Sequence, residues 1–260
     1  MSAPTPSQVI ERVYGMTLFI AFGKLVGASG MMPSTLTPDR IQEMDQKVEK
    51  IAGKMLLAGE KNGFMDCLTL AEKKTIVTPF HLLEDQALSA ATWRIESLAV
   101  LLWALKLVDN IPNYDALAAT SVSSVLKIDK FQESRSTAVL QSVSELESAR
   151  ELAELWHWRC RTRQLIEKGE KFPEELAAKS QFKSFDDIVR FTVKGAKETG
   201  TAEKLCVVDE DFGVRGKAVR DLSAKEFADV SSLAYERHFA LNWLCGRAPE
   251  NNWDDTPTDT

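Results

Sequence analysis

The chain has 260 residues, of which 44% are hydrophobic and 27% charged, and its formal net charge is −6. This composition is typical of a globular protein and excludes disordered, collagen-like and coiled-coil classes. The acidic balance also argues against a protein that binds the phosphate backbone of nucleic acids, because such binding needs clustered lysine and arginine. The first function classes to be set aside are therefore fibrous and nucleic-acid-binding proteins.

Apolar periodicity of 3.6 residues and capping signals predict that most of the chain is helical. The sequences Thr69–Glu72 and Ser223–Glu226 both fit a capping box, so each is expected to start a helix. Residues 27–36 are expected to form a turn-rich linker. The predicted helices cover residues 7–26, 38–61, 70–77, 78–108, 133–168 with a break near its start, 173–179, 185–197 and 224–245.

Residues 205–222 differ from the rest of the chain. Residues 205–208 resemble a strand, and the stretch around Gly213 and Gly216 alternates in the manner of a small hairpin. The sequence therefore predicts one mainly α, multi-helix domain over residues 1–260. A minor β element near residues 205–220, within a small insertion over 205–222, completes this prediction.

The cysteines are few and scattered, and no CxxC pair occurs. This pattern favours reduced thiols in a cytoplasmic protein over a disulfide framework. The four positions are Cys67, Cys160, Cys206 and Cys245.

No apolar run approaches the roughly 20 residues that span a bilayer, so no membrane association is expected. Residues 16–22 resemble the apolar core of a short signal peptide, which leaves secretion as an alternative. A signal peptide has a basic segment before its apolar run, which Glu11 disrupts, and Lys24 adds a charge before a cleavage site. An ordinary core helix is therefore the preferred interpretation.

Two predicted helices carry charged residues at positions that their apolar periodicity predicts to be buried. Trp93, Glu96 and Trp103 share one face, so Glu96 should be buried among indoles and either paired or neutral. Trp156 and Arg159 share a face of a second helix. A guanidinium on an aromatic stripe is stable when a carboxylate satisfies it, and we expect Arg159 to pair with Glu96.

The last predicted helix carries a third set of polar residues. Arg237 interrupts its apolar stripe, while His238 and Asn242 line the neighbouring face. The tail that follows is expected to fold back onto this helix. Its carboxylates are Asp254, Asp255 and Asp259.

All six tryptophans fall in these three helices and the tail, so we expect them to wall one shared polar cluster. The cluster is either a structural brace or an open site. If it is open, the candidate binding residues are Trp93, Arg94, Trp103, Arg159, Arg237, Asn242, Trp243, Trp253 and Asp259.

The sequence supports two functional hypotheses. A hydrolase would use His238 as general base, with Glu96 and Asp254 or Asp255 as its acidic partners. In this hypothesis Arg237 stabilises the developing negative charge, and a divalent metal either assists the reaction or is absent. No nucleophile, phosphate loop or metal-ligand spacing supports it, and no cofactor or metal is expected. This favours a non-enzymatic binding or regulatory protein, such as an immunity-type factor, whose partner is a protein or a small ligand.

Three segments resemble signatures of the bacterial DUF4272 family. Residues 93–105 (WRIESLAVLLWAL) resemble its WRxESL…LLWAL pattern, residues 236–244 its ERHxALNWL, and residues 253–260 its WDDxxxDT. Residues 1–60 and 205–222 match loosely, and Glu154 stands where an arginine is usual. The resemblance implies an uncharacterised bacterial cytosolic protein and transfers no chemistry. It also implies that one constellation holds Glu96, Arg237, His238, Asn242, Asp254, Asp255 and Asp259.

Overall fold

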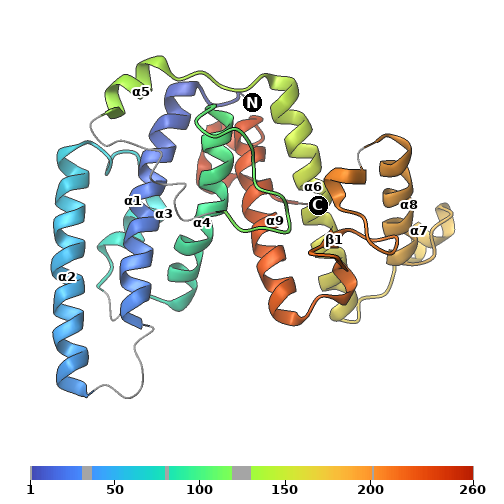
Figure 1. Cartoon of the computed structure of the whole chain (residues 1–260), viewed down its shortest axis with the longest axis horizontal. Helices are drawn as coiled ribbons and strands as arrows, with labels where there is room; N and C mark the ends of the chain where they lie inside the picture. The colour runs from blue at the N-terminus through green and yellow to red at the C-terminus, as the bar shows by residue number, and fades with distance from the viewer. Residues whose placement is uncertain (1, 31–36, 80–81, 119–129, 201, 260) are drawn as a thin grey trace. The chain divides into compact units, whose positions relative to one another are not determined.

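The computed structural model describes residues 2–30, 37–79, 82–118, 130–200 and 202–259. Within these ranges the chain forms nine α-helices and one two-stranded antiparallel sheet (Figure 1), which confirms the mainly α fold with a minor hairpin. No helix among the described residues is long and apolar enough to cross a membrane.

The chain divides into two compact units. Unit 1 comprises Met1–Ile111, Ala118–Ser142 and Asn242–Pro257, and unit 2 comprises Pro112–Leu117, Val143–Leu241 and Thr258–Thr260. The expectation of a single domain stays a prediction, and each unit is described by itself.

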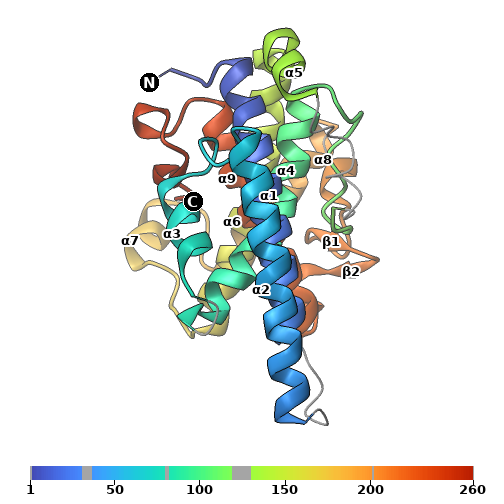
Figure 2. The same cartoon turned by 90° about the vertical axis from the view of Figure 1, so that its left-hand side faces the viewer.

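Unit 1 is built around α1, which lies between α2 and α4 (Figure 1), and Figure 2 shows α2 running along α1. The contact of α1 with α4 is close, because a Cβ atom on Gly23 would lie 2.4 Å from Cβ of Ala91. The helices of this unit are α1 (Pro6–Gly30), α2 (Pro38–Lys61), α3 (Leu70–Val77), α4 (Asp85–Ala104) and α5 (Phe131–Thr137).

Helix boundaries in unit 1 follow the local chemistry. Thr69 forms the predicted capping box with Glu72 at the start of α3. Thr78 is extended, as expected before a proline, and the helix predicted over 78–108 covers only Asp85–Ala104. The linker predicted over residues 27–36 is wrong at its start, since α1 continues to Gly30, and residues 31–36 lie outside the described residues.

Unit 2 contains the hairpin and most of α9 (Ala224–Leu244). Its other helices are α6 (Val143–Glu167), α7 (Glu174–Lys179) and α8 (Phe185–Glu198), and its strands are β1 (Gly213–Val214) and β2 (Lys217–Ala218). The strand predicted over residues 205–208 is wrong, because Ala202–Leu205 forms a 3₁₀ turn and Val208 makes only an isolated bridge with Asp211.

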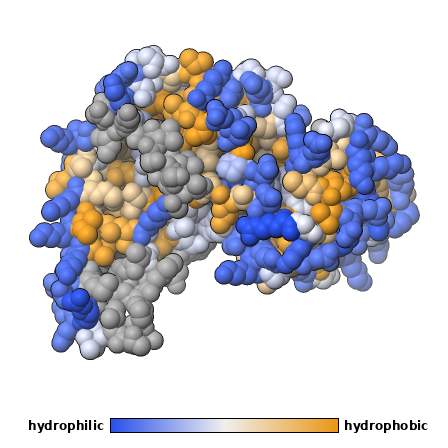
Figure 3. Space-filling view, in the orientation of Figure 1, coloured by the Kyte–Doolittle hydropathy of each residue, from blue (hydrophilic) through white to orange (hydrophobic). Residues whose placement is uncertain are grey.

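The face shown in Figure 3 is mostly polar, with separate apolar patches between the polar side chains. Scattered exposed apolar residues are normal in a folded protein and do not by themselves mark a site. Buried charges and cavities are stronger indicators of a functional site.

Candidate functional site

The candidate residues predicted from the sequence fall into two groups, one in each unit. Unit 2 holds Arg159, Arg237, His238 and Asp259. Unit 1 holds Trp93, Arg94, Glu96, Trp103, Asn242, Trp243, Trp253, Asp254 and Asp255.

Glu96 is fully buried, as predicted, on α4 in unit 1. Its Oε1 atom accepts a hydrogen bond of 2.7 Å from the backbone N–H of Ala118. The Trp93 and Trp103 side chains on the same helix are half-buried. The carboxylate therefore fixes a backbone position, which is a structural task.

Arg159 forms a buried ion pair with Asp211, so the predicted pairing with Glu96 is wrong. Its Nε and Nη2 atoms donate to the two carboxylate oxygens at 2.6 and 2.7 Å. Asp211 also accepts from the backbone N–H groups of Phe212 and Arg220, at 2.8 and 3.0 Å. Asp211 follows two residues in the left-handed conformation, where helical periodicity gives no guide to side-chain position.

Arg237 is fully buried on α9, as its place in an apolar stripe predicts. Its guanidinium donates to the carbonyl oxygens of Pro112, Asn113 (3.2 Å) and Ala116 (3.0 Å). It also lies 5.0 Å from the ring centre of Tyr114, which stacks on Trp156 with ring centres 4.7 Å apart. Arg237 thus holds the backbone of residues 112–116 within unit 2.

His238 meets a partner that the sequence did not reveal. Its Nδ1 atom lies 3.0 Å from Nδ1 of His157, and both rings are buried. Burial lowers the pKa of His157 to about 4, helped by the positive charges of His238 and Arg161. Burial likewise lowers the pKa of His238 to about 4, so both imidazoles are neutral at pH 7 and share one hydrogen bond.

The tail folds back within unit 1. Asn242 on α9 donates to the carbonyl oxygen of Pro257 at 2.8 Å. Asp254 accepts at 3.3 Å from the N–H of Ala71 in the first turn of α3, and Asp255 accepts from Asn252 at 2.6 Å. Both aspartates are exposed. They support the ends of short helical segments, in keeping with the capping preference of carboxylates.

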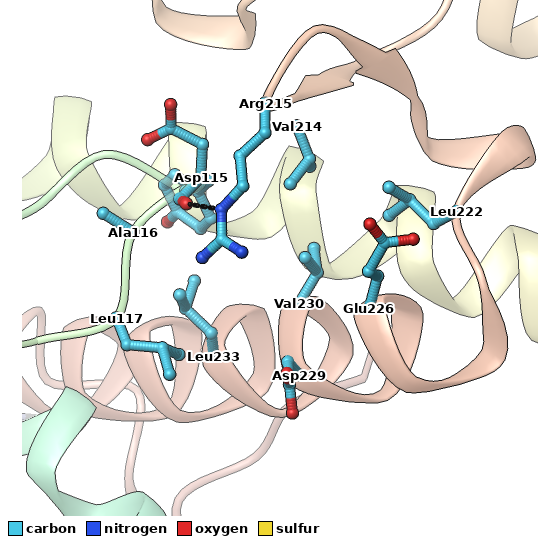
Figure 4. Close-up of a pocket in the computed structure, with 11 residues that line it drawn as sticks. Asp115, Ala116, Leu117, Val214, Arg215, Leu222, Glu226, Asp229, Val230 and Leu233 are labelled. Carbon is cyan, nitrogen blue, oxygen red and sulfur yellow. Dashed lines mark hydrogen bonds between the residues drawn. The ribbon is translucent and has the colours of Figure 1, made fainter.

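A small pocket opens beside the hairpin in unit 2, and we call it the hairpin pocket (Figure 4). Its free volume is about 30 Å³, enough for about two water molecules. It is lined by Tyr114, Asp115, Ala116, Leu117, Val214, Arg215, Leu222, Glu226, Asp229, Val230 and Leu233.

Arg215 stands at one side of the hairpin pocket. Its Nε atom donates to the carbonyl oxygen of Asp115 at 2.9 Å, and Figure 4 shows its two terminal nitrogens directed into the pocket. Arg215 is exposed, so these two nitrogens are open to solvent. Arg215 and Gly216 form the two-residue turn between β1 and β2, with φ of 52° and 78°.

The opposite side of the hairpin pocket is acidic and its floor is apolar. Glu226 accepts from Lys217 at 2.8 Å, and hydrogen bonds with Lys217 and Ser223 lower its pKa to about 2. Asp229 lies one helical turn further along α9. Val230 and Leu233 are buried in the floor.

A larger hollow lies in unit 1, and we call it the tryptophan cavity. Its free volume is about 330 Å³. It is lined by Gln8, Glu11, Arg12, Asp66, Cys67, Leu68, Thr69, Leu70, Trp243, Asn251, Asn252 and Trp253.

Neither Glu96 nor His238 lines the hairpin pocket or the tryptophan cavity. Among the described residues, no group of three or more His, Cys, Asp or Glu is placed to hold a metal ion. Sequence reasoning missed Arg215 and Asp229. The available signal was an arginine before a glycine inside the predicted hairpin, since hairpin turns favour asparagine, aspartate or glycine.

Comparison with known proteins identifies a family and nothing more. The model of the family described as "Domain of unknown function (DUF4272)" matches residues 30–183. This range includes the 93–105 signature and ends before the 236–244 and 253–260 signatures. No curated protein and no solved structure matches the chain.

Proposed function

The chain belongs to the DUF4272 family, whose description assigns no activity, and we propose that it is a non-enzymatic binding protein. In this proposal the protein binds a partner polypeptide at the hairpin pocket. The observation that carries the proposal is the exposed Arg215 guanidinium, whose terminal nitrogens are directed over an apolar floor in the hairpin pocket.

On its Arg215 side, opposite Glu226 and Asp229, the hairpin pocket can take a carboxylate beside a small aliphatic group. A guanidinium binds a carboxylate through two parallel N–H donors, which fixes orientation as well as charge. Val230 and Leu233 offer the neighbouring apolar surface, and the free volume of about 30 Å³ limits the occupant to a small group. A C-terminal valine presents both groups together, so a polypeptide that ends in valine is the simplest occupant.

The backbone at Arg215 supports the same proposal. A non-glycine residue at φ of 52° is strained, by about 1–3 kcal/mol, and such strain concentrates at functional sites. An asparagine would suit this turn better. The presence of arginine at a position that disfavours it is explained if its guanidinium binds a ligand.

The hydrolase alternative receives less support from the same geometry. Its proposed base, His238, is buried against His157, and Glu96 holds a backbone N–H. Neither side chain borders the two described cavities. The four cysteines are free thiols, which supports a further part of the proposal, that the protein works in the cytoplasm.

Replacing Arg215 by asparagine is expected to weaken binding while stabilising the hairpin. Affinity for the peptide acetyl-Gly-Ser-Gly-Val, with a free carboxylate, should fall at least about tenfold, because a charge-assisted hydrogen-bonded pair is lost. The free energy of unfolding should stay constant or rise by about 0.5–1 kcal/mol, because asparagine fits the turn. An NMR titration and urea denaturation measure the two effects.

The matched control is Arg190→Asn, which removes the same charge from the exposed face of α8 in unit 2. Its affinity for the peptide should equal that of the unmodified protein. Equal binding by the Arg215→Asn and Arg190→Asn variants would overturn the proposal.

A further inference from the structure

The tryptophan cavity is an open hollow with the volume of a small-molecule site. Its volume of about 330 Å³ lies at the lower end of the roughly 300–1,000 Å³ of ligand pockets. Two of its walls are Trp243 and Trp253, whose ring centres lie 5.1 Å apart at 70°. The indole N–H of Trp243 donates to the carbonyl oxygen of Asn251 at 3.0 Å, which fixes that wall.

Arg12 lines the cavity, but its charge is neutralised. Its guanidinium forms a buried, two-point ion pair with Glu72 and donates to the carbonyl oxygen of Cys67 at 3.3 Å. It also lies 4.8 Å from the ring centre of Trp253. Its Nε atom is a buried donor without an acceptor among the described residues.

The remaining charged groups of the cavity are carboxylates. Asp66 is exposed at the rim and has no charged partner among the described residues, and Glu11 accepts from Arg135 at 2.6 Å. The negative charges of Glu11 and Asp66 act on the Cys67 thiol in the cavity wall. The pKa of the Cys67 thiol rises to about 11, first because the thiol is buried and then because Glu11 and Asp66 lie near it.

The 250–252 segment adds an acceptor to this acidic wall. Glu250 and Asn251 both adopt the left-handed conformation, with φ of 50° and 58°. The side-chain amide of Asn251 donates to Gln8, while its Oδ1 atom is buried without a donor among the described residues. Acceptors and carboxylates beside aromatic walls suit a donor-rich cation.

We propose that the tryptophan cavity is a second binding site, separate from the hairpin pocket, for a small organic cation with N–H donors. The ammonium or guanidinium group pairs with Asp66 and Glu11 at the rim, and the carbon chain lies against the indoles. The cation comes either from a free amine or from an arginine side chain of a polypeptide, since both present the same group.

Isothermal titration calorimetry with agmatine tests the proposal on the full chain. Agmatine should bind, and glutarate, a dicarboxylate of similar length, should not. The Asp66→Asn variant should bind agmatine about three- to fivefold more weakly, as expected for a partly exposed charge pair. The matched control is Asp109→Asn, an exposed aspartate of unit 1 outside the cavity, which should leave binding unchanged.

Three results would overturn the proposal: no heat of binding with agmatine, glutarate binding as tightly as agmatine, or equal effects of Asp66→Asn and Asp109→Asn. Asp66 is exposed, so its variant should fold normally. A parallel titration with Nα-acetyl-arginine amide identifies the source. Binding of agmatine alone supports a free amine, and binding of both compounds supports an arginine side chain.

Discussion

Replacing Asp211 by alanine is expected to lower the free energy of unfolding by about 3–5 kcal/mol, because it leaves the buried guanidinium of Arg159 without its carboxylate. Both side chains are almost completely buried. The substitution also removes the acceptor of two backbone N–H groups, those of Phe212 and Arg220. Urea denaturation, monitored by tryptophan fluorescence, measures the effect.

The control is Asp221→Ala, which removes a nearby exposed carboxylate that lies 3.8 Å from Arg220. An exposed pair of this kind contributes at most about 1 kcal/mol. A further variant combines Asp211→Ala with Arg159→Met and should recover part of the loss, since no buried charge is then left unpaired. An Asp211→Ala protein as stable as the Asp221→Ala protein would refute the structural role of the pair.

Acidification from pH 6.5 to 5 is expected to destabilise the protein through His157 and His238. Folding lowers the pKa of each from 6.5 to about 4, so below pH 6.5 the unfolded chain binds protons that the folded chain does not. Stability therefore falls as the pH falls through this range, and the two groups contribute no change above it. At pH values below 4 the loss approaches roughly 3 kcal/mol for each histidine.

Urea denaturation of the His238→Asn variant isolates this effect. Asparagine keeps a hydrogen-bonding group beside His157 but does not titrate, so stability should fall less steeply between pH 6.5 and 5. Ordinary carboxylates titrate below this pH range, so they contribute little to the difference in slope between the variant and the unmodified protein. Identical slopes for the variant and the unmodified protein would show that His238 is not held neutral by folding.

Local signals predicted much of the fold because their causes are local. The capping boxes at Thr69 and Ser223 lie within four residues, and the structure contains both. The strand prediction for residues 205–208 was wrong because it relied on their apolar side chains alone, whereas in the structure only Val208 pairs, with Asp211. The prediction that a helix begins at Thr78-Pro79 was wrong because a proline holds the residue before it extended.

Burial at the site was predictable, but partners were not. Periodicity placed Glu96 and Arg237 in the interior, and both are fully buried. Both form hydrogen bonds with backbone atoms of residues 112–118, in irregular chain that periodicity does not locate. Asp211 and His157 were missed as partners for the same reason, since their positions depend on tertiary packing.

The hairpin pocket depends on chain segments that are far apart in sequence. Arg215 comes from the hairpin turn, Asp115 from the loop after residue 111, and Leu233 from α9. The sequence predicted only a small hairpin around Gly213 and Gly216, and the structure shows that Arg215 and Gly216 form its turn.

The most direct test of the binding proposal measures how strongly Arg215 is coupled to the ligand carboxylate. The affinities of acetyl-Gly-Ser-Gly-Val with a free carboxylate and with a C-terminal amide are compared for the unmodified protein and for Arg215→Gln. The account predicts that the unmodified protein prefers the carboxylate by at least about tenfold and that Arg215→Gln has no preference. A carboxylate preference that survives in the Arg215→Gln protein would contradict it.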